Sequence, residues 1–275
     1  MSAAFHGVEF SPRFSKRPDI SHVVFDFDGT LSWLRHGWPE IMFEVFRERL
    51  APRPGESDAQ IRALLMDAII GLNGKPTIFQ MMRFAEIQTE RGAPAPDPEA
   101  LRAEYQRRLD DAIERRSQRI RNGAAAKDDF VVFGARRLIE HLLRLGITPI
   151  ILSSTVEERV KAEAQLLDLA RYFGRHIYGG VGDPTQFSKL RVFERLLREE
   201  NITGAHLLSF GDGPVEIHNT VELGGLAIAV CSDENVNGSG KMDEFKRAQL
   251  LAAGAHAAIA DYRDAVDLFD HILTP

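Results

Sequence analysis

The distribution of apolar residues predicts short buried strands that alternate with helices. Five short runs rich in β-branched, aromatic and other apolar residues cover positions 23–27, 147–153, 206–210, 226–231 and 257–260. Nearly continuous apolar runs of this length are typical of strands buried on both faces of a parallel sheet. Between them, apolar residues recur at helical spacing, for example over 138–145 and 190–197. This alternation predicts an α/β fold with a doubly wound, Rossmann-like parallel sheet and right-handed crossovers.

The alternation is interrupted once, by a long segment without a strand-like run. Helical patterns alone occupy this segment, and glycines and prolines separate them; they cover residues 38–50, 57–71, 76–91 and 97–121. We therefore expect an α/β core formed by residues 1–36 and 128–275, interrupted by a helical domain at 37–127. Two glycine-containing stretches, 179–182 and 235–240, are interpreted as loops.

Composition and charge narrow the class of protein. Hydrophobic residues make up 44% and charged residues 27% of the 275 positions, values that exclude disordered, collagen-like and membrane-spanning chains. The net charge of −6 provides no overall positive field, so a nucleic acid is not expected as a partner. No stretch approaches 18 uninterrupted apolar residues, so a membrane is not expected either. The single cysteine, Cys231, excludes an internal disulfide and a cysteine-rich zinc site, and together with the absence of a signal-like apolar run it favours the cytoplasm.

Polar side chains follow three of the predicted strands. Asp26-Phe27-Asp28-Gly29-Thr30 ends the first, Ser153-Ser154 ends the second, and residues 211–216 follow the third with Asp212 and Glu216. In an open α/β sheet the carboxyl ends of the strands form the ligand-binding edge, close to the switch in strand order. We therefore expect four carboxylates and two hydroxyl groups at one edge, where Lys189, at the start of a predicted helix, could join them.

A group of carboxylates at one edge indicates a metal ion. Crowded carboxylates are costly unless a cation compensates their charge. A ligand set of oxygen atoms, without cysteine or histidine, favours a hard ion, and Mg²⁺ suits carboxylates that act together with a phosphate substrate. The chemistry that these groups serve is phosphoryl transfer, which needs a nucleophile, charge neutralisation and a proton shuttle.

The motifs and their order resemble those of the haloacid dehalogenase superfamily. Residues 26–30 are similar to its first motif, D-x-D-G-T, and Ser153 resembles the hydroxyl residue of the second. Lys189 corresponds to the lysine of the third motif, and Asp212 with Glu216 resembles the fourth. Within this superfamily the chain looks like the phosphatases with a helical cap between motifs one and two, in the phosphoglycolate phosphatase-like and β-phosphoglucomutase-like branch.

The resemblance implies roles for four residues in catalysis. Asp26 is then the nucleophile that forms an aspartyl-phosphate, and Asp28 protonates the leaving group and later activates water. Ser153 hydrogen-bonds the transferring phosphoryl group, and Lys189 neutralises the nucleophile and the phosphate.

The resemblance also implies a metal site. Asp26, the backbone carbonyl of Asp28 and Asp212 would hold Mg²⁺, and Glu216 would bind it directly or through water. Glutamate replaces the aspartate that is common at position 216, which leaves its manner of binding open.

Further contacts to phosphate or substrate are expected from Gly29, Ser154, Lys75 and Arg35. Lys75 lies in Gly74-Lys75-Pro76-Thr77, between two helices of the expected cap, and resembles part of a specificity loop. It is not part of a nucleotide-binding P-loop, because the earlier glycine and the following Ser or Thr are absent. Arg35 follows motif one among aromatic residues, which are equally suited to packing at a hinge.

The expected activity is a Mg²⁺-dependent phosphatase that acts on a small phosphorylated metabolite, with sugar phosphates favoured. A phosphomutase with the same nucleophile is the nearest alternative. A non-catalytic sugar-phosphate sensor is a further alternative, although Asp26, Asp28 and Lys189 are all present. A signalling receiver also collects acids, a hydroxyl and a lysine on an α/β sheet, but it lacks the paired aspartates and the large insertion. Neither the substrate nor the oligomeric state follows from the sequence.

Overall fold

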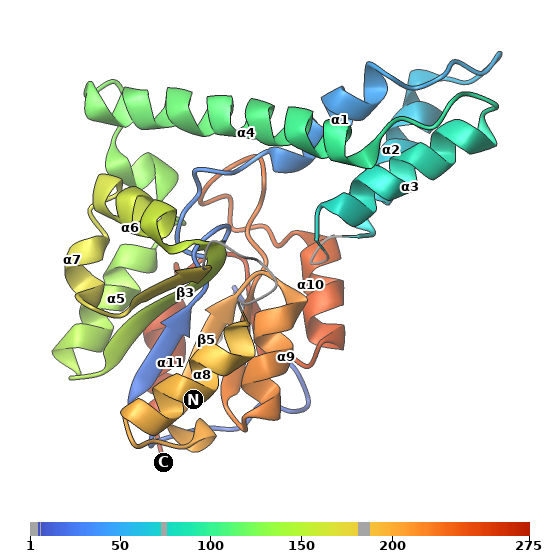
Figure 1. Cartoon of the computed structure of the whole chain (residues 1–275). Coiled ribbons are helices and arrows are strands. Elements are labelled where there is room, and N and C mark those ends of the chain that lie inside the picture. The colour runs from blue at the N-terminus through green and yellow to red at the C-terminus, as the bar shows by residue number, and fades with distance from the viewer. Residues whose placement is uncertain (1–4, 6, 73–75, 181–187) are drawn as a thin grey trace. The chain divides into compact units, whose positions relative to one another are not determined.

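A computed structural model describes residue 5 and residues 7–72, 76–180 and 188–275 (Figure 1). The described chain forms two compact units by internal contacts, one of residues 1–34 with 119–275 and one of residues 35–118. No helix in these described ranges is both long enough and apolar enough to cross a lipid bilayer.

The larger unit contains a seven-stranded sheet in the order β1-β7-β6-β5-β2-β3-β4. The strands are β1 (Val8–Phe10), β2 (His22–Phe25), β3 (Thr148–Val156), β4 (Ile177–Gly180), β5 (Leu207–Gly211), β6 (Leu226–Val230) and β7 (Ala257–Ile259). All neighbouring pairs are parallel except β1 with β7. The predicted doubly wound α/β fold is therefore confirmed, as a mostly parallel sheet with one antiparallel edge.

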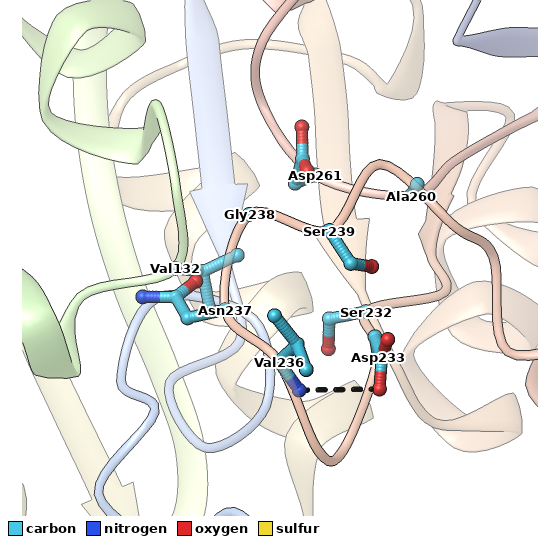
Figure 2. A pocket seen from close by; sticks show the side chains of 9 residues that line it. All are labelled: Val132, Ser232, Asp233, Val236, Asn237, Gly238, Ser239, Ala260 and Asp261. Carbon is cyan, nitrogen blue, oxygen red and sulfur yellow. Dashed lines mark hydrogen bonds between the residues drawn. The ribbon is translucent and has the colours of Figure 1, made fainter.

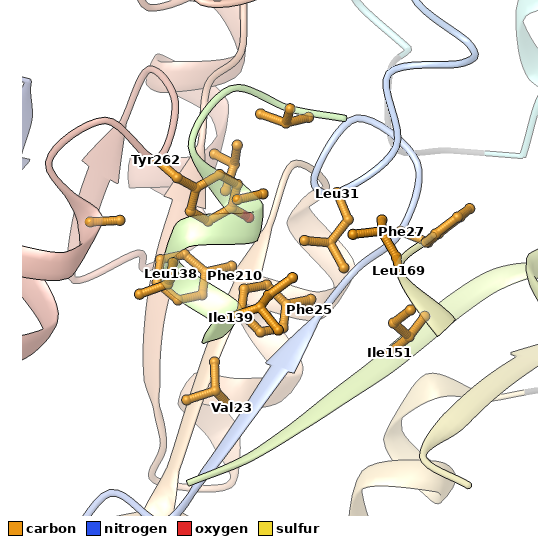
Figure 3. Close-up of a cluster of buried hydrophobic side chains, with 14 of the residues drawn as sticks. Val23, Phe25, Phe27, Leu31, Leu138, Ile139, Ile151, Leu169, Phe210 and Tyr262 are labelled. Atoms are coloured by element: carbon orange, nitrogen blue, oxygen red, sulfur yellow. The ribbon is translucent and has the colours of Figure 1, made fainter. Parts of the chain in front are cut away.

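Strand alternation explains why both faces of this sheet are buried. Val23 and Phe25 of β2 belong to one apolar cluster, whereas Val24 between them belongs to another on the opposite face. Successive side chains of a strand point to opposite faces of the sheet, so a continuous apolar run requires other elements to cover both faces. Figure 3 shows the first cluster, in which Phe25 stacks on Phe210 of β5 with ring centroids 5.2 Å apart.

Helices from the larger unit contribute to the clusters on both faces. Those contributing to the cluster of Phe25 are α5 (Ala135–Arg144), α6 (Glu157–Leu166), α7 (Ala170–Phe173) and α11 (Ala265–Leu273). Those contributing to the opposite clusters are α8 (Lys189–Glu199), α9 (Pro214–Glu222) and α10 (Glu244–Ala252). Two short 3₁₀ helices, Lys127–Phe130 and Gly204–His206, precede α5 and β5.

Within its described residues the smaller unit consists of helices and their connecting loops, and it has its own core. Its helices are α1 (Trp38–Arg47), α2 (Asp58–Ile70), α3 (Ile78–Glu90) and α4 (Pro98–Arg121), the last of which ends in the larger unit. Phe46 and Phe84 stack at its centre with ring centroids 4.3 Å apart. Each helix begins and ends within three residues of the range predicted from its apolar pattern.

The strand predictions were wrong at β1, β3 and β4. β1 was not predicted, and it pairs antiparallel with β7 through only three residues. β3 continues to Val156, beyond the expected end at Ser153-Ser154, because β4 pairs with it as far as the pair Val156 and Gly180.

The stretch 179–182 was interpreted as a loop, but Gly179 and Gly180 are the last two residues of β4. Backbone atoms of Ser154, Thr155 and Glu157 lie so close that a Cβ atom at either glycine would collide with them. Glycine here indicates a close backbone approach rather than a loop. Residues 181–182 lie outside the described part of the chain.

Candidate active site

The topology brings the ends of β2 and β5 together at the switch point of the sheet. These strands are neighbours, although the chain first adds β3 and β4 on one side of β2 and then returns to place β5 on the other. Asp26 directly follows β2, and Asp212 directly follows β5. The sheet therefore places both carboxylates at the edge where α/β proteins bind their ligands.

Asp26 is held in place by its backbone and by both carboxylate oxygens. Its N–H donates to the carbonyl of Phe210 at 2.9 Å, which extends the pairing of β2 with β5 by one residue. Its Oδ1 accepts a hydrogen bond from the N–H of Phe27 at 2.8 Å, and its Oδ2 lies 3.0 Å from Nζ of Lys189. The carboxylate is thus oriented with one oxygen against a cation.

Lys189 is the first residue of α8 and is buried, with 5% of its side chain exposed. Its ammonium group lies between Asp26 and Glu216, with Oε2 of Glu216 at 3.1 Å. Burial alone would lower the pKa of Lys189, but the two carboxylates outweigh it and raise the pKa above its usual value. Lys189 is therefore a buried cation held between two carboxylates.

Glu216 is the third residue of α9 and serves the helix as well as the site. Its Oε1 accepts a hydrogen bond from the N–H of Gly213 at 2.6 Å, while Oε2 faces Lys189. A Cβ atom at Gly211 or Gly213 would collide with this side chain, which explains both glycines. Burial raises the pKa of Glu216 to about 8, although Lys189 opposes the shift.

Asp212 is contacted on both oxygens. The hydroxyl of Thr30 donates to Oδ1 at 3.3 Å, and Nζ of Lys246 donates to Oδ2 at 3.3 Å. Burial raises the pKa of Asp212 to about 6, against the opposing effect of Lys246. Gly29 has a φ of +74°, and a Cβ atom there would overlap Oδ2 of Asp212, so the turn after β2 admits only glycine at this position.

The residues at this edge suit a divalent metal ion. Asp26, Asp212 and Glu216 each offer a carboxylate oxygen, and these three atoms lie within 4.8 Å of one another. Oxygen donors alone, with no cysteine or histidine among them, match the preference of Mg²⁺. The sequence analysis predicts these same three side chains, together with the carbonyl of Asp28, as metal ligands.

Asp28 has a partner that the sequence analysis missed. The hydroxyl of Thr155 on β3 donates to Oδ2 of Asp28 at 2.7 Å. The N–H of Thr155 in turn donates to the hydroxyl oxygen of buried Ser153 at 3.1 Å. Ser154, the residue between them, is exposed. The two-residue spacing of Ser153 and Thr155, typical of side chains on one strand face, was the signal that could have identified Thr155.

Two predicted substrate contacts cannot be located at this edge. Arg35 is the first residue of the helical unit, which is described separately from the unit that holds the carboxylates. Lys75 lies outside the described residues. Both stay predictions from the sequence.

The sequence analysis also missed Lys246, whose ammonium group contacts Asp212 and, at 2.6 Å, Oε1 of Glu234. Glu234 belongs to the polar segment 232–244, which comes after β6 in the chain. A usable signal was the position of Lys246 in the first turn of a helix, where a cation is unfavourable unless carboxylates are near.

Residues of the 232–239 segment also line a shallow depression (Figure 2). Its lining residues are Val132, Ser232, Asp233, Val236, Asn237, Gly238, Ser239, Ala260 and Asp261. None of them is a predicted site residue. The hydroxyl of Ser232 donates to the carbonyl of Gly29 at 3.0 Å, so this segment also supports the turn after β2.

Comparisons with solved structures show the same fold in many proteins. A conserved haloacid dehalogenase-like protein of unknown function from Agrobacterium tumefaciens has a TM-score of 0.65 and 16% identity, with 93% of this chain and 100% of that chain covered. A predicted phosphoglycolate phosphatase from Haemophilus somnus has a TM-score of 0.58 and 12% identity over 91% and 98% of the two chains. A predicted beta-phosphoglucomutase from Thermotoga maritima has a TM-score of 0.55 and 16% identity over 92% and 99%. At these identities the likeness establishes the fold alone.

A search of curated proteins found no match. The sequence model of the haloacid dehalogenase-like hydrolases matches residues 20–218, a range that contains the strand ends and every carboxylate of the cluster described above. The chain therefore belongs to the haloacid dehalogenase-like hydrolase family.

Proposed function

We propose that this hydrolase is a Mg²⁺-dependent phosphatase that acts on a small phosphorylated metabolite through an aspartyl-phosphate on Asp26. The observation that supports this proposal most strongly is the setting of Asp26. Its carboxylate lies 3.0 Å from the ammonium of Lys189 and within 4.8 Å of carboxylate oxygens from Asp212 and Glu216. A nucleophile, a fixed cation and further metal ligands meet at one point, as phosphoryl transfer requires.

In the first step, a carboxylate oxygen of Asp26 attacks phosphorus, and the bond from phosphorus to the ester oxygen breaks. Asp28 supplies the proton that the departing oxygen needs. In the second step, Asp28 removes a proton from water, which attacks phosphorus and releases inorganic phosphate together with free Asp26. Lys189 stabilises the charge of the phosphoryl group, and Ser153, Ser154 and Gly29 are proposed to contact its oxygens.

Mg²⁺ is proposed to be held by Asp26, the carbonyl of Asp28, Asp212 and, directly or through water, Glu216. When bound, the ion would neutralise charge on the carboxylates and on the phosphate.

Residues 37–127 are proposed to form a cap that selects the substrate, with Lys75 and Arg35 as candidate contacts. A cap of this size suits a small phosphate ester, with sugar phosphates favoured. The proposed setting is the cytoplasm, because the single cysteine, Cys231, is a buried free thiol.

The direct test is phosphate release from a panel of phosphorylated metabolites, measured with Mg²⁺ and with EDTA. Hydrolysis of one compound class that requires Mg²⁺ supports the proposal. An isomerised product together with a long-lived phosphoenzyme would instead select the phosphomutase, which the same carboxylates could serve. Binding of a sugar phosphate with neither outcome would select the sensor.

Thr155→Val is expected to lower kcat by about 10- to 100-fold, because Asp28 loses the hydrogen bond that orients it (about 1.5–3 kcal/mol for a bond to a charged group). Valine keeps the shape and the β-branch of threonine. Thr274→Val, the same change at an exposed position after α11, serves as the comparison and should leave kcat unchanged. Steady-state kinetics on the preferred substrate measure kcat. A kcat of Thr155→Val equal to the wild-type value would show that Thr155 does not assist Asp28.

Mg²⁺ binding is expected to weaken as the pH falls. Burial gives Glu216 a pKa of about 8 and Asp212 a pKa of about 6 in the metal-free protein. Below these values the carboxylates hold protons that Mg²⁺ must displace, so its Kd should rise about tenfold per pH unit while one proton is displaced. Calorimetric titration between about pH 8.5 and about pH 6.5 measures this slope. Glu216→Gln should flatten the slope near neutral pH, and a Kd independent of pH in the wild-type protein would contradict the expectation.

A further inference from the structure

Lys246 is a second buried lysine at the carboxylate cluster, in addition to Lys189. It is the third residue of α10, and 4% of its side chain is exposed. Its Nζ donates to Oδ2 of Asp212 at 3.3 Å and to Oε1 of Glu234 at 2.6 Å. The proposed reaction assigns it no role.

The position of Lys246 is unfavourable unless its carboxylate partners compensate. Burial of an ammonium group costs several kcal/mol, and the N-terminal end of a helix repels a positive charge. Asp212 and Glu234 outweigh both effects and raise the pKa of Lys246 above its usual value. Lys246 is thus a charged group that the fold holds against Asp212.

The start of α10 is itself anchored to the sheet. Oδ1 of Asp243, the N-cap residue, accepts a hydrogen bond from the N–H of Lys246 at 2.9 Å. The N–H of Asp243 donates to the carbonyl of Cys231, directly after β6, at 2.9 Å. Because β6 is the neighbour of β5, the backbone of Lys246 is tied to the sheet beside the strand that Asp212 follows.

Asp212 is consequently held on both oxygens before any metal binds. Thr30 donates to Oδ1, Lys246 donates to Oδ2, and Gly29 leaves the space that Oδ2 occupies. A carboxylate fixed in this way keeps free lone pairs for a metal and does not need to reorient. Groups that orient metal ligands in this manner contribute strongly to metal affinity.

We propose that Lys246 is a positioning residue that orients the carboxylate of Asp212 for metal binding, with Glu234 balancing its charge. This rests on the proposed function only in that Asp212 is a metal ligand.

A positioning role and a purely electrostatic role of Lys246 predict opposite changes in the Kd for Mg²⁺ when this lysine is replaced. A lysine that acted only through its charge would repel Mg²⁺, so its removal would tighten binding. A lysine that orients Asp212 would, on removal, leave the carboxylate free to turn away, and binding would weaken. The direction of the change in Kd therefore separates the two roles.

The test is calorimetric titration of MgCl₂ into the metal-free protein, without substrate. Lys246→Met is expected to raise the Kd for Mg²⁺ by about 10- to 100-fold. Lys241→Met is the matched control, because it removes the same charge from an exposed lysine close to Lys246 in the chain, and its Kd should equal the wild-type value. An unchanged or lower Kd in Lys246→Met overturns the proposal.

A double variant keeps the test decisive if Lys246→Met fails to fold. Lys246→Met with Glu234→Gln removes the lysine without leaving the charge of Glu234 unbalanced. If Lys246 only neutralises Glu234, the double variant binds Mg²⁺ as the wild type does, and the proposal fails. If Lys246 positions Asp212, binding stays weakened by about 10- to 100-fold.

The same titration distinguishes this proposal from the proposed activity. Wild-type protein that binds Mg²⁺ but releases no phosphate from any metabolite overturns only the phosphatase proposal. Wild-type protein that takes up no Mg²⁺ overturns both.

Discussion

Asp26→Asn is expected to abolish phosphate release, with a loss of about 10,000-fold or more, because the amide cannot attack phosphorus. Asparagine keeps the size of the side chain and the oxygen that accepts the hydrogen bond from Phe27. It removes one negative charge from a cluster in which Asp26, Asp212 and Glu216 lie within 4.8 Å of one another. Steady-state phosphate release on the preferred substrate measures the effect.

Asp26→Asn is expected to lose activity without losing thermal stability. Lys189 retains Glu216 as a partner, and repulsion among the carboxylates falls, so the Tm of the metal-free protein should equal or exceed the wild-type value. Asp19→Asn, the same change at an exposed position, should leave both activity and Tm unchanged. Activity of Asp26→Asn within about tenfold of the wild type would rule out Asp26 as the nucleophile.

Lys189→Met is expected to reduce kcat/KM by about 100- to 1,000-fold, because the site loses the fixed cation that stabilises the phosphoryl group. It should also destabilise the metal-free protein. Asp26 and Glu216 then remain buried without their shared partner, a change that costs about 3–5 kcal/mol in comparable cases. Chemical denaturation with and without Mg²⁺ measures this cost, and Mg²⁺ should restore part of the stability because it replaces the missing positive charge.

Lys161→Met is the control for the change at Lys189. Lys161 also pairs with a glutamate, Glu157, but 53% of its side chain is exposed, so its removal should change neither activity nor stability. If Lys189 is the shared partner of Asp26 and Glu216, the Asp26 and Lys189 variants should both lose activity but should change stability in opposite directions. Wild-type stability and activity in Lys189→Met would contradict it.

The fold was predictable where its signals are local. The apolar run that ends at Asp26 and the helical spacing over 190–197 each depend on residues close together in sequence, and both elements are present. β4 was missed because its glycines serve a close approach to β3, a requirement imposed by backbone atoms more than twenty residues away in the chain. A local pattern cannot distinguish such a glycine from one in a turn.

The residues of the proposed site were likewise easiest to predict where their sequence signals are local. Asp26 and Asp28 could be proposed from one short segment, and Asp212 with Glu216 from another. Thr155 and Lys246 had only indirect local signals, a two-residue spacing on a strand and a place in the first turn of a helix, because each acts through a contact with a carboxylate 127 or 34 positions away, respectively. The contacts themselves depend on where strands and helices end in space, and the assembled sheet identifies them.

The central claim is that a phosphoryl group is transferred to Asp26. It is tested most directly by mixing the protein with Mg²⁺ and its preferred phosphate ester, quenching with acid during the first turnover, and mapping phosphorylated peptides by mass spectrometry. The account predicts a phosphoryl group on Asp26, stable in acid and labile in base, that is absent from Asp26→Asn. Full phosphate release with Asp26 unmodified, or with the phosphoryl group on another side chain, would contradict it.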